Sequence, residues 1–309
     1  MESMNNYRLS FAPLQGHTGH IYRNLFAKIF GNIDRYYTPY LSFENDGSIK
    51  NAKLRDVSDI NKDICVIPQI LFANADEAIK LAKIVEEKGY DTVNLNLGCP
   101  FPMTINKGRG SALLSHPEKL DEIFNLLFSN TKLKISIKTR TGLHQHSELE
   151  AIIPIFNKYP FCEIIIHPRV ADQLYKGEAD VDEFLKYRTL IKHVTVYNGD
   201  INSSNFQHFL SGSLKDQHEL MIGRGILQNP FLPMLIRNIP IVDEKSKIRE
   251  FITALIESYQ KAFTHDPFVL NKMKEHFEYL GDWFPAELKI KKKVKKAKNL
   301  SEFKEAFRY

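Results

Sequence analysis

The stretch Asn94-Leu-Asn-Leu-Gly-Cys-Pro100 joins the end of an apolar segment to a turn and places a cysteine within that turn. Residues 91–96 are typical of a buried strand, and Gly98 and Pro100 end it. Because both neighbours of Cys99 favour a turn, we expect its thiol to be presented at the carboxyl end of the strand and not buried. Parallel barrels carry their catalytic groups at that end.

Short apolar runs rich in β-branched and aromatic residues predict seven further strands. The eight predicted strands are residues 7–12, 33–43, 64–70, 91–96, 133–138, 162–167, 194–198 and 219–222. Amphipathic segments of helical period lie between most of them, at 21–29, 75–87, 117–128, 149–156 and 204–210. Eight strand and helix units within about 240 residues favour an α/β fold of the TIM-barrel type over an open doubly wound sheet.

The pattern changes after Pro240, where residues 247–263, 269–280 and 286–298 are each typical of a helix. We therefore predict a barrel domain over residues 1–240 and a small all-helical domain over residues 241–309. The region from residue 243 onward carries 15 Lys and Arg against 11 Asp and Glu. Seven lysines between residues 289 and 298, with no acid among them, predict a contact with a polyanion, although a solvated helix face would have the same pattern.

The composition is that of a globular protein, with 43% hydrophobic and 26% charged residues among 309 and a net charge of +5. No apolar run reaches the roughly 18 residues of a membrane span, and residues 1–8 lack the pattern of a signal peptide, so we expect a cytoplasmic protein without membrane contact. The three cysteines are widely spaced, which indicates neither a disulfide framework nor a metal site. Cys65 and Cys162 lie within apolar strand patterns, and we expect both to pack in the core.

Polar side chains follow six consecutive predicted strands. They are Gln69, Asn96 with Cys99, Lys138 with Arg140, His167, the loop Asn198-Gly199-Asp200 and the pair Gly223-Arg224. The carboxyl ends of barrel strands meet at one rim, and loops after the seventh and eighth strands commonly hold a phosphate. Glycines let backbone amides approach phosphate oxygens, and an arginine adds a forked pair of hydrogen bonds. The sequence therefore predicts a cofactor that bears a phosphate.

Eight motifs occur in one order along the chain, between residues 12 and 230. They are Ala12-Pro-Leu-Gln-Gly16, Asn96-Leu-Gly-Cys-Pro100, Gly108-Arg-Gly-Ser-Ala112, Ile137-Lys-Thr-Arg140, His167-Pro-Arg169, Gln173-Leu-Tyr-Lys-Gly177, Asn198-Gly-Asp200 and Ile222-Gly-Arg-Gly-Ile-Leu-Gln-Asn-Pro230. In this order they resemble the tRNA-dihydrouridine synthase family, and the helical tail resembles that family's tRNA-binding domain.

The resemblance implies an FMN enzyme that uses NADPH to reduce the C5–C6 double bond of specific uridines in tRNA. Hydride would pass from flavin N5 to C6, and Cys99 would give the proton to C5. A thiol suits this role because it is mostly protonated at neutral pH yet acidic enough to donate. By the same resemblance, Pro13 and Leu14 would line the flavin, Gln69, Lys138 and His167 would hydrogen-bond its ring, and Asn198, Gly199, Asp200, Gly223 and Arg224 would hold its phosphate. Asn96, Arg140 and Tyr175 would bind the substrate.

A uridine inside folded tRNA must leave its stack to reach a barrel rim. Besides the tail lysines, we expect a basic track around the rim from Arg23, Lys107, Arg109, Arg169 and Lys176. Two alternatives remain open: a flavin barrel acting on a free pyrimidine, like dihydroorotate or dihydropyrimidine dehydrogenases, and an RNA-binding protein without catalysis. The sequence predicts no metal and no obligate protein partner, and it does not identify the uridine that is reduced.

Overall fold

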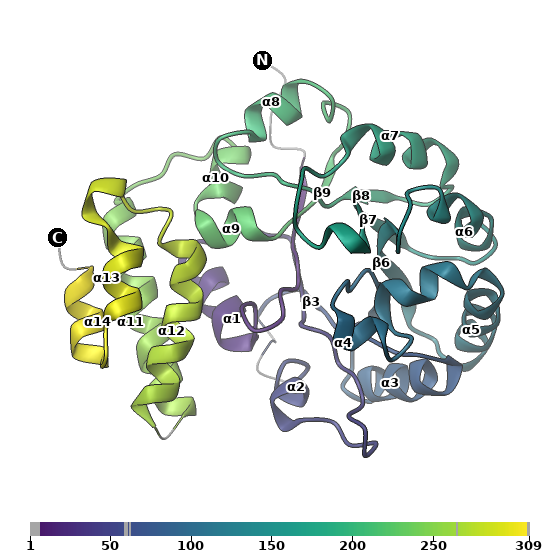
Figure 1. Cartoon of the computed structure of the whole chain (residues 1–309), viewed down its shortest axis with the longest axis horizontal. Helices are drawn as coiled ribbons and strands as arrows, with labels where there is room; N and C mark the ends of the chain where they lie inside the picture. Colours follow the sequence, from purple (N-terminus) through teal and green to yellow (C-terminus); the bar gives the residue numbers. More distant parts are fainter. Residues whose placement is uncertain (1–6, 59–60, 62, 264, 308–309) are drawn as a thin grey trace.

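The computed structural model describes residues 7–58, 61, 63–263 and 265–307. Its strands are β1 (Arg8–Phe11), β2 (Arg35–Tyr37), β3 (Val66–Ile67), β4 (Gln69–Ile70), β5 (Thr92–Leu97), β6 (Lys134–Gly142), β7 (Glu163–Val170), β8 (Thr195–Tyr197) and β9 (Glu219–Ile222). All pair in parallel in the order β3-β2-β1-β9-β8-β7-β6-β5-β4. Because β3 and β4 are consecutive pieces of one segment, the sheet returns to its starting point as a barrel (Figure 1).

Pro68 divides the predicted strand 64–70 into β3 and β4, because proline lacks the N–H that a ladder needs. The barrel wall continues across this break. The Pro68 carbonyl accepts a hydrogen bond from the Asn94 N–H (2.8 Å), and the Gln69 N–H donates to Thr38 Oγ1 (3.0 Å). The prediction of a TIM barrel is therefore confirmed, with one strand position built from two short pieces.

Alternation along the strands sorts their side chains into an inner and an outer layer. The inner cluster consists of Ala12, Tyr37, Ile67, Ile165, Val196 and Met221. The outer cluster, which includes Leu9, Leu95 and Ile164, packs between the sheet and the surrounding helices. Polar residues that lie an even number of positions from an inner-cluster residue on the same strand therefore project into the barrel, above or below its apolar layer.

Paired charges fill the amino-terminal end of the barrel. Glu163, only 1% exposed, accepts a hydrogen bond from the Tyr37 hydroxyl and lies 2.8 Å from the Arg35 guanidinium. Arg8 forms an ion pair with Glu219 beside them. The carboxyl ends of the strands, at the opposite end of the barrel, are left for a binding site.

The helices around the barrel are α1 (His20–Ile29), α2 (Asn51–Arg55), α3 (Ala75–Glu87), α4 (Pro102–Ile105), α5 (Pro117–Asn130), α6 (Glu148–Phe156), α7 (Val181–Leu190), α8 (Phe206–Ser211), α9 (Arg224–Gln228) and α10 (Leu232–Ile236). The predicted helix 75–87 is confirmed at both ends. The Asn74 side chain caps α3 by accepting from the Glu77 N–H (3.0 Å). None of the helices in the described ranges combines the length and apolar character of a membrane span.

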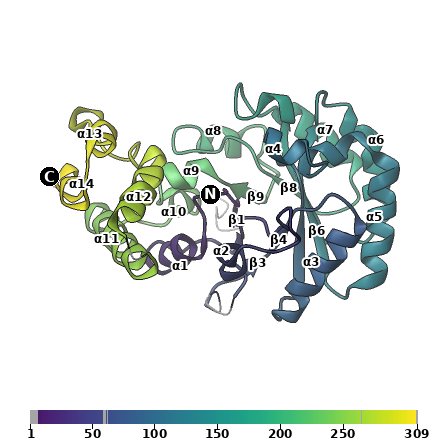
Figure 2. The same cartoon turned by 60° about the horizontal axis from the view of Figure 1, so that its bottom comes forward.

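A helical region follows the barrel and lies beside α1 and α9 (Figures 1 and 2). It comprises α11 (Glu244–Ala262), α12 (Asp266–Leu280), α13 (Ile290–Lys296) and α14 (Leu300–Ala306). The Phe251 ring of α11 lies 5.2 Å from the Tyr22 ring and 5.1 Å from the Phe30 ring. The region therefore shares the outer core of the barrel, and a separate domain after residue 240 stays a prediction.

The prediction of one helix over residues 286–298 is wrong. A short 3₁₀ turn (Ala286–Leu288) ends at Lys289, whose φ of 51° is left-handed, and α13 begins only at Ile290. The chain then forms α14, which we did not predict. Its cap was readable in the sequence, since the Asn299 side chain accepts from the Glu302 N–H (2.9 Å).

The prediction that Cys65 and Cys162 pack in the core is also wrong, because both are exposed. Cys65 stands one residue before β3 and Cys162 one residue before β7. The Cys65 carbonyl already accepts from the Tyr36 N–H (2.8 Å) and the Cys162 N–H donates to the Ile135 carbonyl (2.9 Å), so both residues lie at the edge where the sheet begins. Apolar neighbours in the sequence therefore did not imply burial of the thiols.

Replacing the buried carboxylate at the closed end should destabilise the protein strongly. Glu163→Ala leaves the largely buried Arg35 with the more distant Glu219 carboxylate (3.7 Å) as its remaining ion-pair partner, and we expect a loss of about 3 kcal/mol in the free energy of unfolding, the lower end of the range for breaking a buried pair. Urea denaturation followed by circular dichroism measures it. Lys80→Ala, which breaks an exposed ion pair with Asp76, is the control and should cost less than about 0.5 kcal/mol. Equal losses would contradict this account of the buried cluster.

Candidate active site

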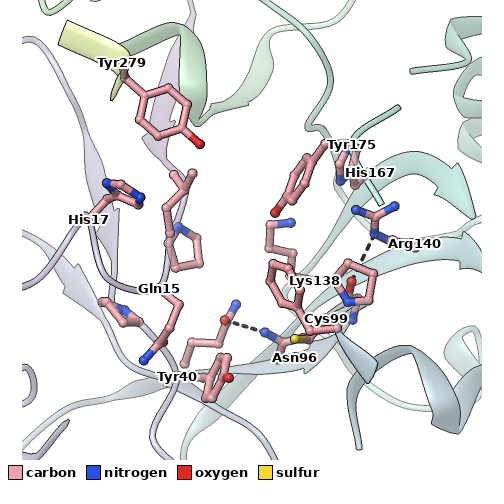
Figure 3. A pocket seen from close by; sticks show the side chains of 17 residues that line it. Gln15, His17, Tyr40, Asn96, Cys99, Lys138, Arg140, His167, Tyr175 and Tyr279 are labelled. Atoms are coloured by element: carbon pink, nitrogen blue, oxygen red, sulfur yellow. Dashed lines mark hydrogen bonds between the residues drawn. The ribbon is translucent and has the colours of Figure 1, made fainter. Parts of the chain in front are cut away.

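A cleft opens at the carboxyl ends of the strands (Figure 3). Its two ends, called here the Cys99 end and the Arg224 end, share the lining residues Pro13, Leu14, Lys138, His167 and Tyr175. The cleft is therefore continuous. It brings together all fourteen residues expected from the sequence. Pro13, Leu14, Gln69, Asn96, Cys99, Lys138, Arg140, His167 and Tyr175 line the Cys99 end, and Asn198, Gly199, Asp200, Gly223 and Arg224 line the Arg224 end.

A chain of hydrogen bonds between side chains crosses three neighbouring strands beneath the Cys99 end. Asn94 of β5 donates to Ser136 Oγ of β6 (2.8 Å) and accepts from Gln69 Nε2 of β4 (2.7 Å). Gln69 Oε1 in turn accepts from Asn96 Nδ2 (2.7 Å). Each amide has a defined orientation because each of the three NH₂ groups donates one hydrogen to an acceptor within this chain. Gln69 and Asn96 each keep one amide hydrogen for a ligand.

The last member of this chain fixes the backbone of Cys99. Asn96 Oδ1 accepts from the N–H groups of Gly98 (3.1 Å) and Cys99 (2.9 Å). On the other side, the Cys99 carbonyl accepts from the Ser111 hydroxyl (2.8 Å). The thiol donates to Thr104 Oγ1 (3.3 Å). The cysteine is therefore held through its N–H, its carbonyl and its sulfur.

The expectation that Cys99 is not buried is wrong, since the residue is only 7% exposed. The segment from Gly108 onward folds back against it, and Gly110 makes this approach possible. A Cβ at Gly110 would lie 2.9 Å from the Cys99 Cβ and 2.9 Å from its carbonyl oxygen, and its φ of 63° also favours glycine. The thiol nevertheless lines the cleft, where Figure 3 shows its sulfur beside Asn96 and Tyr40.

Lys138 supplies a cation to the middle of the cleft. Burial and the charge of Arg140 lower the pKa of Lys138 to about 7, although nearby Cys99 opposes the shift. The lining of the Cys99 end includes no carboxylate among the described residues. An anionic group bound here would therefore meet a lysine that no acid of this end neutralises.

His167 lies beside this lysine as a neutral hydrogen-bond donor. Burial and the cations Arg140 and Lys138 hold the pKa of His167 well below its ordinary value. Its Nε2 lies 2.9 Å from Arg169 Nη1, and a guanidinium only donates, so Nε2 is the acceptor. The proton of the neutral ring is therefore on Nδ1, where it can be donated to a ligand.

The Arg140 guanidinium forms hydrogen bonds with backbone carbonyl groups. It donates to the carbonyls of Gly98 (3.1 Å), Val170 (2.8 Å) and Leu174 (2.5 Å). Burial lowers the pKa of Arg140 to about 10, so it remains protonated at neutral pH. These bonds tie the loop before Cys99 to the loop that carries Tyr175. The residue that we expected to bind substrate thus also positions both sides of the cleft.

Two guanidinium groups lie close to the Tyr175 ring. Arg140 lies 5.5 Å and Arg224 lies 4.8 Å from its centroid, both within the range of a cation–π contact. Tyr175 therefore forms a wall between the two ends of the cleft.

The Arg224 end is organised by Asp200. Its carboxylate accepts from Arg224 (2.6 Å), from Arg169 and from the Ala179 N–H (3.0 Å). Burial is the largest single effect and would raise the pKa of Asp200, but the hydrogen bonds from Arg169 and Ala179 and the charges of Arg169 and Arg224 together lower it. A carboxylate would repel a phosphate, so Asp200 fits the role of orienting Arg224.

Glycine is required in the neighbouring loop. A Cβ at Gly199 would lie 2.0 Å from the Tyr197 hydroxyl oxygen, which packs beneath the loop. Only a bare backbone fits here, as in loops whose amides approach an anion.

Three arginines of the expected basic track are buried, and that part of the prediction is wrong. Arg23 is 0% and Arg169 is 1% exposed, and Arg109 is bonded to Glu77 and to the Phe43 carbonyl. Their charges stabilise loops instead of facing solvent. The other two residues of the track, Lys107 and Lys176, are exposed.

Sequence reasoning missed several cleft residues. Tyr40 lies shortly after β2, just as Gln69 lies shortly after β3. The expectation that polar residues at the ends of strands line the cleft would therefore have identified Tyr40. Arg169 was expected in the basic track and not in the cleft, although it lies two residues beyond His167 and therefore on the same face of β7. Gln15 and His17 belong to the loop after β1. Tyr279 comes from α12, and no local pattern in the sequence points to it.

The donors of the cleft suit an anionic ligand with a phosphate. Among the described lining residues, Asp200 is the one carboxylate, against the cations Lys138, Arg140, Arg169 and Arg224. Pro13 and Leu14 add an apolar surface along the same wall. A flat ring that accepts hydrogen bonds, carrying a phosphate, would satisfy both ends.

Comparisons with known proteins give a consistent picture. The family profile described as dihydrouridine synthase (Dus) matches residues 10–308. A "probable tRNA-dihydrouridine synthase" of Helicobacter pylori is 27% identical over 271 residues, which are 84% of this chain and 80% of that protein. The "tRNA-dihydrouridine(16) synthase" of Neisseria meningitidis is 23% identical over 97% of this chain and 94% of its own length.

A third relative is matched over a shorter stretch. The "tRNA-dihydrouridine synthase B" of Pasteurella multocida is 31% identical over 166 residues. The match covers 53% of this chain and spans about half of that relative, 49% of its length.

Solved structures share the barrel at low identity. Morphinone reductase is 10% identical with a TM-score of 0.51, covering 75% of this chain and 86% of that one. A variant of NCR from Zymomonas mobilis is 13% identical with a TM-score of 0.52, covering 80% and 95%. At these identities the likeness shows the fold alone.

The low pKa of Lys138 predicts how stability varies with pH. Between about pH 7 and pH 10.5, an unfolded chain holds this proton and the folded chain does not, so stability gains from this group as pH rises. Lys138→Met removes the effect. We expect the variant to be more stable than the natural protein at pH 7, with an advantage that shrinks toward pH 9.5. Urea unfolding of both proteins measures this difference, and an advantage that is constant with pH would contradict the low pKa.

Proposed function

Since the chain belongs to the dihydrouridine synthase family, we propose that it is a tRNA-dihydrouridine synthase that uses FMN and NADPH to reduce the C5–C6 double bond of uridines in tRNA. One observation carries this proposal. Cys99 lines one end of a cationic cleft whose other end offers Gly199, Gly223 and Arg224 to a phosphate. The proposed proton donor and the proposed cofactor site would therefore be parts of the same cavity.

When bound, FMN would supply the hydride, which the protein itself cannot provide. Pro13 and Leu14 would pack against its ring. Donors to the ring would be the free amide hydrogen of Gln69, the Lys138 ammonium and His167 Nδ1. Asn198, Gly199, Gly223 and Arg224 would bind the phosphate, with Asp200 holding the guanidinium in place. Bound anionic groups would favour the charged form of Lys138.

Cys99 would act as the general acid at C5 of the uracil. The structure supports this role through restraint, because Asn96, Ser111 and Thr104 bond its N–H, carbonyl and sulfur. A donor held in one place meets the reacting carbon without a search through rotamers. The thiol hydrogen bond to Thr104 would be exchanged for one toward the substrate.

The uracil would be read by the groups nearest to Cys99. Asn96 keeps one Nδ2 hydrogen for a carbonyl oxygen, since its other hydrogen goes to Gln69. Tyr175 offers a ring face and a hydroxyl, and Arg140 holds the loops on either side of it. Hydrogen bonds to the base edge combined with stacking are how proteins read a base that has left its stack.

The tRNA would be held by the lysines of α13. Ile290 and Val294 are buried and anchor this helix, so that Lys292, Lys293 and Lys296 remain exposed. Exposed lysines can replace the counterions of phosphate groups, which buried arginines cannot. Lys107 and Lys176 would extend this contact near the cleft.

Replacing the thiol tests the proposal directly. Cys99→Ala should retain FMN and its reduction by NADPH, because the thiol is not among the proposed donors to the ring. It should lose formation of dihydrouridine by about 100-fold or more, the usual contribution of a general acid. Visible spectra follow the flavin, and mass spectrometry of digested tRNA measures dihydrouridine. Unchanged product formation would refute the acid role.

The natural protein serves as the reference in this experiment. Incubation with unmodified tRNA, free uracil and dihydroorotate separates the alternatives. Turnover of the free pyrimidines alone would favour the small-molecule oxidoreductase, and a protein that cannot be loaded with flavin would exclude both enzymes.

Neutralising the lysines of α13 should weaken tRNA binding in a way that depends on salt. Replacing Lys292, Lys293 and Lys296 with Gln should reduce the slope of log affinity against log salt by about 2 to 3, close to one per lost phosphate contact. Filter binding at several salt concentrations measures it. The matched control replaces three exposed lysines across the barrel from α13 with Gln (Figure 1). They are Lys83 in α3, Lys88 just after α3 and Lys119 in α5. Equal slopes for both triple variants would reject α13 as the contact.

A further inference from the structure

The helical region contributes a side chain to the cleft itself. Tyr279, one residue before the end of α12, lines both the Cys99 end and the hollow around Asp200 and Arg224. All other lining residues of the Cys99 end come from the barrel and its loops. The cavity around Cys99 is thus completed by a residue from the far end of the chain.

Contacts along one face of α12 hold Tyr279 in this position. The Lys272 ammonium donates to the Gly16 carbonyl in the loop after β1. One turn later, the His276 ring stacks on Tyr22 of α1 at 4.9 Å. The His17 ring meets the Tyr279 ring edge to face at 5.1 Å. Residues 272, 276 and 279 share a helix face, so the whole face of α12 is fastened to the barrel beside the cleft.

Tyr279 faces Tyr175 across the cleft. Figure 3 shows Tyr279 and Tyr175 on opposite sides of the cavity with their hydroxyl groups directed into it, and Lys138 and Cys99 below Tyr175 in this view. The two groups are close enough for Tyr279 to contribute to the raised pKa of Tyr175, after the larger effect of burial. Each ring has its own support, which is a pair of arginines for Tyr175 and His17 for Tyr279.

We propose that Tyr279, held by His17, is a substrate-contacting residue that forms the second wall of the entrance through which the target nucleotide reaches Cys99. This inference rests on the proposed function. A nucleotide that enters between the tyrosines meets an aromatic ring on both sides, and stacking on aromatic rings tolerates any base while it retains an extruded one. The helical region then acts in catalysis as well as in holding the tRNA.

The test compares Tyr279→Ala, Tyr279→Phe and His17→Ala with the natural protein. For Tyr279→Ala we expect kcat/KM for tRNA to fall about tenfold or more, with FMN affinity and the rate of flavin reduction by NADPH unchanged. Tyr279→Phe keeps the ring and should restore most of kcat/KM. His17→Ala should show a smaller loss in the same direction. Phe268→Ala, which alters a 62% exposed ring at the other end of α12, is the control and should match the natural protein.

Two outcomes would overturn the proposal. One is a Tyr279→Ala protein with natural kinetics on tRNA. The other is a weaker FMN affinity with normal tRNA kinetics at saturating FMN, which would assign Tyr279 to the cofactor.

A second measurement separates this inference from the proposed function. A tRNA transcript containing 4-thiouridine is crosslinked to the natural protein by light, and the attached peptides are identified by mass spectrometry. Crosslinks to the peptide around Tyr279 support the contact whether or not dihydrouridine forms. Their absence, with crosslinks to α13 present, would overturn it. Failure of the natural protein to form dihydrouridine in any tRNA would instead reject the proposed function.

Discussion

The hydrogen-bond chain from Ser136 through Asn94 and Gln69 to Asn96 is the constraint on which the rest of the site depends. It runs across three adjacent strands, and so the register of the sheet sets the position of its last oxygen. That oxygen accepts from the Cys99 N–H and starts the turn that holds the thiol. A slip of one residue in any of these strands would turn its polar side chain to the outer face and break the chain. The barrel is thus more than a support, because the pairing of β4, β5 and β6 determines where the proposed acid lies.

Buried charges are paired at the amino-terminal end of the barrel, whereas at the carboxyl end one buried cation has no acidic partner among the described residues. At the amino-terminal end, Glu163 meets Arg35 in a buried pair, and the charges compensate one another. At the carboxyl end, Asp200 compensates Arg169 and Arg224. The charged group with the largest effect on the pKa of Lys138 is instead another cation, Arg140, and this pKa is lowered to about 7. Burying an unpaired cation costs free energy, and a bound anion would return it. The imbalance at one end therefore favours occupation of the cleft by an anionic ligand, as the proposed function requires.

Strand periodicity made much of this site predictable. Gln69, Asn96, Lys138 and His167 lie at strand ends with inward parity, and the rule that brings such residues to one rim was sufficient to group them. Burial was less predictable, because it depends on what folds back over a residue. Cys99 is covered by the segment around Gly110, and the thiols of Cys65 and Cys162 are uncovered just outside their strands. Tyr279 was not predictable at all, since its place depends on how α12 packs against the loop after β1.

Such packing also changes what the helical region contributes. Phe251 of α11 packs on Tyr22 and Phe30, and Tyr22 in turn carries the His276 ring of α12. The same aromatic cluster therefore fixes both the attachment of the region and the direction of Tyr279. A region that merely attracted RNA through α13 could vary its angle to the barrel without loss, since attraction between exposed lysines and phosphates has little directional demand. A helical region that also supplies a wall of the cleft cannot vary its angle to the barrel in this way, because a shift of about 1 Å would alter the width of the entrance. The continuous core between α1, α11 and α12 is the physical reason that the proposed binding of tRNA and the proposed placement of its nucleotide can be combined on one surface.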